Sequence, residues 1–226
     1  RFAMCSTFKW ALAAIFLEDV DAGRRSLSEL VPITDADLVP YAPAVEKALS
    51  RGSMTTAELL EAAVGLSDNA AANILLRFIG GPEGFTNRIR ASGDDVTRLD
   101  RWEPDLNENR AGDVRDTTSP MAMANLLQRF LWSGALTNRS NALIASWMIE
   151  SPTGRNRLRA GFPSDWIVGD KTGTSINGAV NAVGFATPPG NETIFFAAYI
   201  DANAISVAKA NDIHRRIGAH IARVFS

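Results

Sequence analysis

The sequence predicts an α+β fold, in which an antiparallel sheet with packed helices stands beside an all-helical lobe. Two observations indicate this class. Helical patterns separated by loops fill residues 6–161, and three strand-like segments then follow one another within residues 166–201. Strands joined by short connections pair antiparallel. We therefore expect one unit over residues 1–226, with the helical lobe at about 6–161 and the sheet and C-terminal helix at about 162–226.

Helices are predicted where apolar residues recur with the helical period and the ends carry capping residues. Thr55 and Glu58 form a capping-box pattern, and Ser119 followed by Pro120 is typical of a helix start. The first segment is apolar on all sides, so we expect it to be buried. The predicted helices of the lobe span residues 6–19, 55–65, 69–81, 82–93, 119–134 and 137–151.

The remaining segments differ in pattern. Residues 166–174, 178–187 and 192–201 are predicted strands, the last two joined by the hairpin-like turn Pro-Pro-Gly-Asn. A helix over 206–225 should pack on one face of the sheet. Residues 93–118 contain few apolar residues and many Asp, Asn and Arg. A loop this long is uncommon inside a compact domain and is usually functional.

Composition excludes several classes of function. The 23 Lys and Arg nearly balance the 25 Asp and Glu, which argues against nucleic acid as a partner. No apolar run reaches the roughly 18 residues of a membrane span, so we expect no span. The single cysteine, Cys5, permits no internal disulfide, and the two histidines, His214 and His220, argue against a zinc hydrolase. We therefore expect no metal, no cofactor, and a nucleophile activated by Lys, Glu or Asp.

Ser6 and Lys9 form a Ser-x-x-Lys pattern at the start of the first predicted helix. Residues three apart share a helix face, so the lysine amine can reach the serine hydroxyl. The helix dipole favours an oxyanion at this end, and a buried lysine loses its proton more readily than an exposed one. The pair is a candidate nucleophile with its activator.

Two further patterns follow in order. Ser-Asp-Asn at 67–69 lies where a loop meets a helix, and Lys-Thr-Gly at 171–173 lies on the first predicted strand. In isolation the first is typical of a helix N-cap, and the second of a strand with an exposed lysine. Together with Ser-x-x-Lys, in this order, they form the pattern of penicillin-recognising serine enzymes.

With these motifs, and with Glu-Pro-Asp-Leu-Asn at 103–107, the sequence resembles the class A serine beta-lactamases over essentially the whole chain. The 103–107 segment is similar to the family's omega loop, whose Glu and Asn hold a hydrolytic water. The resemblance implies the serine beta-lactamase/transpeptidase fold. It also implies hydrolysis of the beta-lactam amide bond of penicillin- and cephalosporin-type antibiotics through a serine acyl-enzyme, which confers resistance. The implied partner is a small beta-lactam substrate.

Catalytic roles follow from the resemblance, residue by residue. Ser6 becomes acylated, and Lys9 activates it directly or by relay. Ser67 passes a proton to the lactam nitrogen. Glu103 is the general base for the hydrolytic water, which Asn107 holds. Whether Lys9 or Glu103 is the acylation base stays open.

The resemblance implies further contacts with the substrate. Asn69 binds the acylamide side chain of the substrate, and Tyr41 lies at the mouth of the site. Many members carry an arginine on the strand after Lys-Thr-Gly, which this sequence lacks. Arg157 matches the position that other members use instead, so we assign it to the substrate carboxylate.

The Lys-Thr-Gly strand supplies the other implied contacts. Lys171 and Thr172 meet the substrate carboxylate, and Gly173 lets it approach the strand. The backbone N–H groups of Ser6 and Thr174 form the oxyanion hole.

Three structural expectations accompany these roles. Arg101 and Asp116 bracket the polar loop, and the family uses such a pair as an ion-pair clasp. Asp68 braces its loop with side-chain hydrogen bonds. A carbapenem-hydrolysing branch pairs a cysteine at the place of Cys5 with one just after Lys-Thr-Gly, where Ser175 stands, so we expect no such disulfide.

Two alternatives share the three motifs. A penicillin-binding peptidase or transpeptidase would be acylated and then stall or transfer to an amine, and a beta-lactam-sensing protein would only bind. Glu103 in its Glu-Pro-x-Leu-Asn setting argues against the first, and the presence of Ser6, Lys9 and Glu103 argues against the second. The resemblance further implies a monomer that is periplasmic or secreted. Relative to the family pattern the chain lacks an N-terminal helix and first strands, so we expect residues 1–226 alone to be poorly stable.

Overall fold

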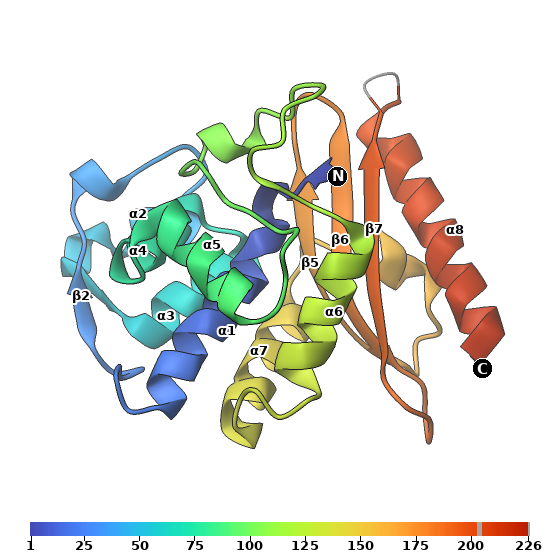
Figure 1. The fold of residues 1–226 in the computed structure, drawn as a ribbon, viewed down its shortest axis with the longest axis horizontal. Helices are drawn as coiled ribbons and strands as arrows, with labels where there is room; N and C mark the ends of the chain where they lie inside the picture. Colours follow the sequence, from blue (N-terminus) through green and yellow to red (C-terminus); the bar gives the residue numbers. More distant parts are fainter. Residues whose placement is uncertain (203–204, 226) are drawn as a thin grey trace.

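The computed structural model describes residues 1–202 and 205–225, and the statements below refer to them. A helical lobe lies against one face of a three-stranded antiparallel sheet, and a long C-terminal helix covers the other face (Figure 1). This arrangement confirms the predicted α+β class. None of the helices in this described part is both long and apolar enough to cross a membrane.

The sheet consists of β5 (Ile167–Thr174), β6 (Ala179–Thr187) and β7 (Ile194–Asp201), in that order and with antiparallel pairing throughout. Successive side chains of a strand point to opposite faces. Val183 accordingly packs into the core shared with the helical lobe, whereas Ala182 packs beneath α8 (Val207–Phe225). The C-terminal helix packs on one face of the sheet, as predicted, and the helical lobe covers the other.

Helix α1 (Phe8–Asp21) runs through the centre of the helical lobe. Its first ten residues are fully buried, the charged Lys9 included. A 3-10 turn, Cys5–Thr7, precedes it, so the regular helix begins two residues after the predicted start at Ser6. A helix that is apolar on all sides is buried on all sides, which holds its N-terminal turn rigidly inside the protein.

The other helices surround α1. Their predicted capping signals are confirmed, since Thr55 forms a capping box with Glu58 and the Ser119 side chain accepts a hydrogen bond from the N–H of Ala122. The helices are α2 (Pro43–Ala48), α3 (Thr56–Glu61), α4 (Asn69–Phe78), α5 (Gly81–Ala91), α6 (Pro120–Leu131) and α7 (Asn138–Glu150). The sequence reasoning did not predict the short helix α2.

The helix predicted over 55–65 is interrupted. After α3 the chain forms one π-helical turn, Ala62–Leu66, and then Ser67 adopts a left-handed conformation with φ of 62°. A non-glycine residue in this region is strained unless its surroundings hold it, and such strain clusters at functional sites. The interruption turns the chain sharply, so that Ser67 lies between two helices.

The lobe also contains strands, so the expectation of an all-helical lobe is incomplete. β1 (Phe2–Ala3) pairs with β4 (Thr117–Thr118), and β2 (Leu30–Pro32) pairs with β3 (Ser53–Thr55). Each strand has only two or three residues, too few to display an alternating pattern. Their partners also lie far apart in the sequence, so local periodicity could not reveal them.

Candidate active site

Four segments converge where the helical lobe meets the sheet. The 3-10 turn and α1 supply Ser6 and Lys9, and the junction before α4 supplies Ser67. The 93–118 loop supplies Glu103, and β5 supplies Lys171. The predicted catalytic residues therefore come together from distant parts of the chain.

Lys9 is fully buried where these four segments meet, and its amine lies inside the protein. Nζ donates to the carbonyl oxygen of Ser67 at 2.8 Å and to Oδ1 of Asn69. It also forms an ion pair of 2.9 Å with Oε1 of Glu103, and both side chains are closed to solvent. Burial lowers the pKa of Lys9, which Glu103 partly opposes.

Glu103 contacts both the candidate nucleophile, Ser6, and another residue of the 93–118 loop. The hydroxyl of Ser6 donates to Oε1 of Glu103 at 3.3 Å, and the amide of Asn107 donates to Oε2 at 2.5 Å. The two carboxylate oxygens therefore have separate partners. Oε1 contacts the candidate nucleophile and its activator, whereas Oε2 contacts the candidate water-holding residue.

Ser67 and Lys171 form a second polar pair. Nζ of Lys171 donates to Oγ of Ser67 at 3.0 Å and to the carbonyl oxygen of Thr172 at 3.0 Å. Burial, reinforced by the nearby charge of Lys9, holds the pKa of Lys171 well below its usual value. Asp68 braces this junction as predicted, because it accepts hydrogen bonds from the N–H groups of Ala44, Val45 and Ala71.

A cavity of about 390 Å³ opens above these groups. Tyr41 stands at its rim with 62% of its surface exposed, in a left-handed conformation with φ of 64°. Lys9, Glu103 and Lys171 lie buried outside this lining set. The lining residues are Ser6, Tyr41, Ser67, Asn69, Asn107, Thr153, Arg157, Thr172, Gly173 and Thr174.

Comparison with known proteins identifies this arrangement. A model of the beta-lactamase enzyme family matches residues 1–225. The solved structure of an ancestral class A beta-lactamase (GNCA) is 45% identical, with a TM-score of 0.97 over 99% of this chain and 86% of that one. The putative class A beta-lactamase PenP from Rhodopseudomonas palustris is 44% identical, with a TM-score of 0.96 over 99% and 85% of the two chains.

This chain belongs to the class A serine beta-lactamases. Its reaction is the hydrolysis of the beta-lactam amide bond. Within the described residues, no group of three or more His, Cys, Asp or Glu side chains lies close enough to hold a metal ion. The arrangement offers nucleophilic chemistry by a serine with buried amine and carboxylate groups beside it.

Arg157 of this beta-lactamase is only 6% exposed, yet it lines the cavity. Its guanidinium donates to the carbonyl oxygens of Gly173 and Asn181 and to Oγ1 of Thr174 at 2.6 Å. Burial lowers its pKa to about 10, so it keeps its charge at neutral pH. Arg157 therefore places a positive charge beside the Lys-Thr-Gly strand and also ties that strand to β6.

Gly173 has a structural role besides the one predicted for it. A Cβ built at this position would lie 2.6 Å from the carbonyl oxygen of Met4 and 3.1 Å from Cβ of Cys5. The absence of a side chain thus lets β5 pack closely against the turn that carries Ser6, the candidate nucleophile. Cys5 is buried and unpaired, as predicted.

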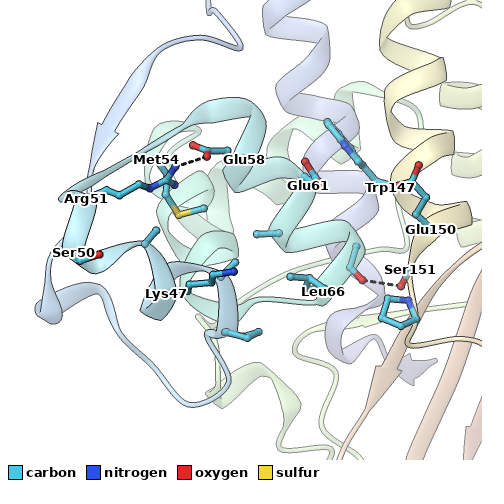
Figure 2. A pocket seen from close by; sticks show the side chains of 16 residues that line it. Lys47, Ser50, Arg51, Met54, Glu58, Glu61, Leu66, Trp147, Glu150 and Ser151 are labelled. Atoms are coloured by element: carbon cyan, nitrogen blue, oxygen red, sulfur yellow. Dashed lines mark hydrogen bonds and ion pairs between the residues drawn. The ribbon is translucent and has the colours of Figure 1, made fainter.

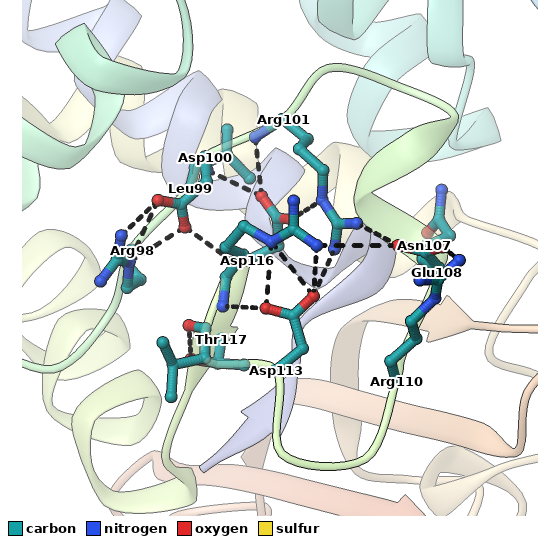
Figure 3. Close-up of polar contacts among 12 residues, drawn as sticks. Arg98, Leu99, Asp100, Arg101, Asn107, Glu108, Arg110, Asp113, Asp116 and Thr117 are labelled. Atoms are coloured by element: carbon teal, nitrogen blue, oxygen red, sulfur yellow. Dashed lines mark hydrogen bonds and ion pairs between the residues drawn. The ribbon is translucent and has the colours of Figure 1, made fainter.

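The 93–118 loop of the beta-lactamase is held by charged groups (Figure 3). The predicted clasp is confirmed, since Nε of Arg101 lies 2.6 Å from Oδ2 of the fully buried Asp116. Oδ1 of Asp116 accepts from the N–H groups of Asp100 and Arg101. Arg101 also pairs with Glu108 through Nη1 at 2.5 Å. One arginine thus joins both ends of the loop segment that contains Glu103.

Sequence reasoning missed two residues of the site. Asn73, on α4, accepts from the N–H of Glu103 at 3.0 Å and donates to its carbonyl oxygen at 2.9 Å. Thr153 lines the cavity and accepts a hydrogen bond of 2.9 Å from Oγ1 of Thr172. Asn is disfavoured inside helices, so an Asn within an apolar helix was a usable signal for Asn73.

A larger cavity, of about 730 Å³, lies elsewhere on the helical lobe (Figure 2). It is lined by side chains of α2, α3 and α7, among them Lys47, Glu61 and Trp147. None of the predicted site residues lines it. This cavity is the larger of the two, but the smaller one is lined by the candidate nucleophile, Ser6, whose hydroxyl contacts the buried Glu103.

Proposed function

We propose that Ser6 is the nucleophile of a two-step hydrolysis of penicillin- and cephalosporin-type antibiotics. Ser6 Oγ loses its proton and attacks the lactam carbonyl carbon, the carbon–nitrogen bond breaks, and that proton reaches the leaving nitrogen through the hydroxyl of Ser67. Water then attacks the ester while Glu103 accepts its proton, and the carbon–oxygen bond breaks as Glu103 returns the proton to Oγ of Ser6. The supporting observation is that Oε1 of Glu103 contacts both Ser6 Oγ, at 3.3 Å, and Lys9 Nζ, at 2.9 Å.

The remaining residues of the cavity bind and orient the substrate in this proposal. Asn69 receives the acylamide group, and Tyr41 covers the mouth. Asn107 holds the hydrolytic water. Lys171, Thr172 and Arg157 receive the substrate carboxylate, which Gly173 allows to approach β5. The backbone N–H groups of Ser6 and Thr174 receive the oxyanion. During acylation the Ser6 proton passes to Glu103, which Ser6 contacts directly, or to Lys9, which contacts the same oxygen of Glu103.

Replacement of Glu103 by Ala tests the proposal. Acylation should leave a stable adduct on Ser6, because the carboxylate that activates water is gone. Mass spectrometry after addition of penicillin should detect one bound acyl group. Glu61→Ala, an exposed carboxylate in the larger cavity, is the matched control and should turn over like the parent. Rapid turnover by Glu103→Ala would refute the role of Glu103, and a stoichiometric burst in the parent would favour a penicillin-binding or sensing protein.

We further propose that the enzyme is a monomer, periplasmic or secreted, which protects its host from beta-lactams. The support is the family to which it belongs. A mass of two chains in sedimentation equilibrium would refute the proposal that the enzyme is a monomer. Activity recovered only from the cytoplasmic fraction of expressing cells would refute the periplasmic or secreted location. If those cells were as susceptible to penicillin as cells without the enzyme, the proposed protective role would be refuted.

A further inference from the structure

We propose that Asn109 and Asn177 form a latch between the 93–118 loop and the turn joining β5 to β6, and that this latch positions Asn107 for deacylation. The two asparagines are positioning residues and do not touch the substrate. The inference rests on the proposed function of Glu103 and Asn107. In Figure 1 the loop lies beside the upper ends of β5 and β6.

The latch consists of reciprocal amide contacts. Nδ2 of Asn109 donates to the carbonyl oxygen of Asn177 at 2.9 Å, and Nδ2 of Asn177 donates back to the carbonyl oxygen of Glu108 at 2.6 Å. Asn109 also donates to Oδ1 of Asp201, at the end of β7, at 3.0 Å. Each amide group has two protons, so Asn109 can satisfy both acceptors.

The backbone at Asn109 is suited to this role. Its φ of 46° lies in the left-handed region, which asparagine tolerates better than other non-glycine residues. The turn of the chain there aims the side chain at both Asn177 and Asp201. An aspartate keeps the same shape and the same tolerance but cannot donate, so it is the isosteric replacement that breaks the latch.

A short path connects the latch with the carboxylate of Glu103. The N–H of Asn177 donates to Oγ of Ser175 at 3.0 Å, and Oγ of Ser175 donates to the carbonyl oxygen of Asn107 at 2.6 Å. The side chain of Asn107 in turn donates to Oε2 of Glu103. The turn therefore fixes the backbone of the residue that is to hold the hydrolytic water.

Loosening the latch should slow deacylation more than acylation. Ser6, Lys9 and Ser67 are held by the helical lobe, and Lys171 by β5, so the latch reaches acylation only through Glu103. Deacylation requires the water in the correct place, and small displacements of a positioning group slow such steps. Both asparagines are partly open to water, which competes for their hydrogen bonds, so we expect deacylation to slow by about 3- to 10-fold.

The experiment uses Asn109→Asp, with the double variant Asn109→Asp plus Asp201→Asn as a rescue. The new carboxylate at position 109 faces two acceptors, whereas the amide introduced at position 201 can donate to it and restore one contact. Asn191→Asp, the same change in the exposed β6–β7 turn, is the matched control. Stopped-flow and quenched mass spectrometry with a penicillin measure acylation and deacylation separately.

In Asn109→Asp we expect deacylation to slow more than acylation, so that acyl-enzyme accumulates. The double variant should recover about half of the loss in the deacylation rate, on a logarithmic scale. Equal slowing of both steps, normal deacylation, or no recovery would overturn the latch. Glu103→Ala, measured alongside, separates the two proposals. If it traps the acyl-enzyme while Asn109→Asp does not slow deacylation, only the latch fails.

Discussion

The amine of Lys9 and the carboxylate of Glu103 form an ion pair of 2.9 Å that is closed to solvent on both sides. Taking two charges out of water is costly, and the cost is offset only when their remaining hydrogen-bonding groups are satisfied. They are satisfied here, by Ser67, Asn69 and Asn107. These contacts offset the cost of burying the pair beside Ser6, whose hydroxyl lies 3.3 Å from Oε1 of Glu103.

Arg157→Ala should raise KM for penicillins by at least about 10-fold and change kcat less, because a charged hydrogen bond to the substrate carboxylate is lost. Arg157→Lys should reverse part of the increase in KM, because it restores the positive charge but not the bidentate hydrogen bonding of a guanidinium. Steady-state kinetics measure both. Arg155→Ala, an exposed neighbour, is the control. An unchanged KM in Arg157→Ala would rule out the assignment.

Asp116→Ala should destabilise the protein by about 2–4 kcal/mol, because it leaves Arg101 and two backbone N–H groups without their buried acceptor. Urea unfolding measures the loss. Arg51→Ala removes an exposed ion pair with Glu58 and should cost no more than about 1 kcal/mol. If the two variants lost equal stability, the clasp would be no stronger than a surface pair.

Cys5→Ala should flatten the dependence of stability on alkaline pH. Burial raises the pKa of the Cys5 thiol from 9.0 to about 12, so above pH 9 the unfolded chain loses this proton while the folded protein keeps it. The free energy of unfolding therefore falls by about 1.4 kcal/mol per pH unit between pH 9 and 12 through this group alone. Denaturant unfolding at several pH values, in the parent and the variant, should give slopes that differ by this amount. Parallel curves would contradict the prediction.

The sequence predicted the parts of the site that depend on short spacings. Ser6 and Lys9 lie a helical turn apart, and the Lys-Thr-Gly motif lies on one strand, so local geometry and the family resemblance together were sufficient. Contacts between segments that lie far apart in the sequence could not be predicted in this way. Asn73 on α4 holds the backbone of Glu103, and Asn109 contacts Asn177, only because the fold brings segments that are distant in the sequence together. No local pattern specifies such pairs.

The burial of Cys5, the only cysteine in the sequence, has a practical consequence. Cys5 is fully buried, so maleimide reagents should leave the native enzyme unmodified. Ile176, by contrast, is completely exposed in the turn after β5. A cysteine placed there would accept a single fluorophore or spin label, and its signal would report movements of this turn and of the neighbouring 93–118 loop during turnover.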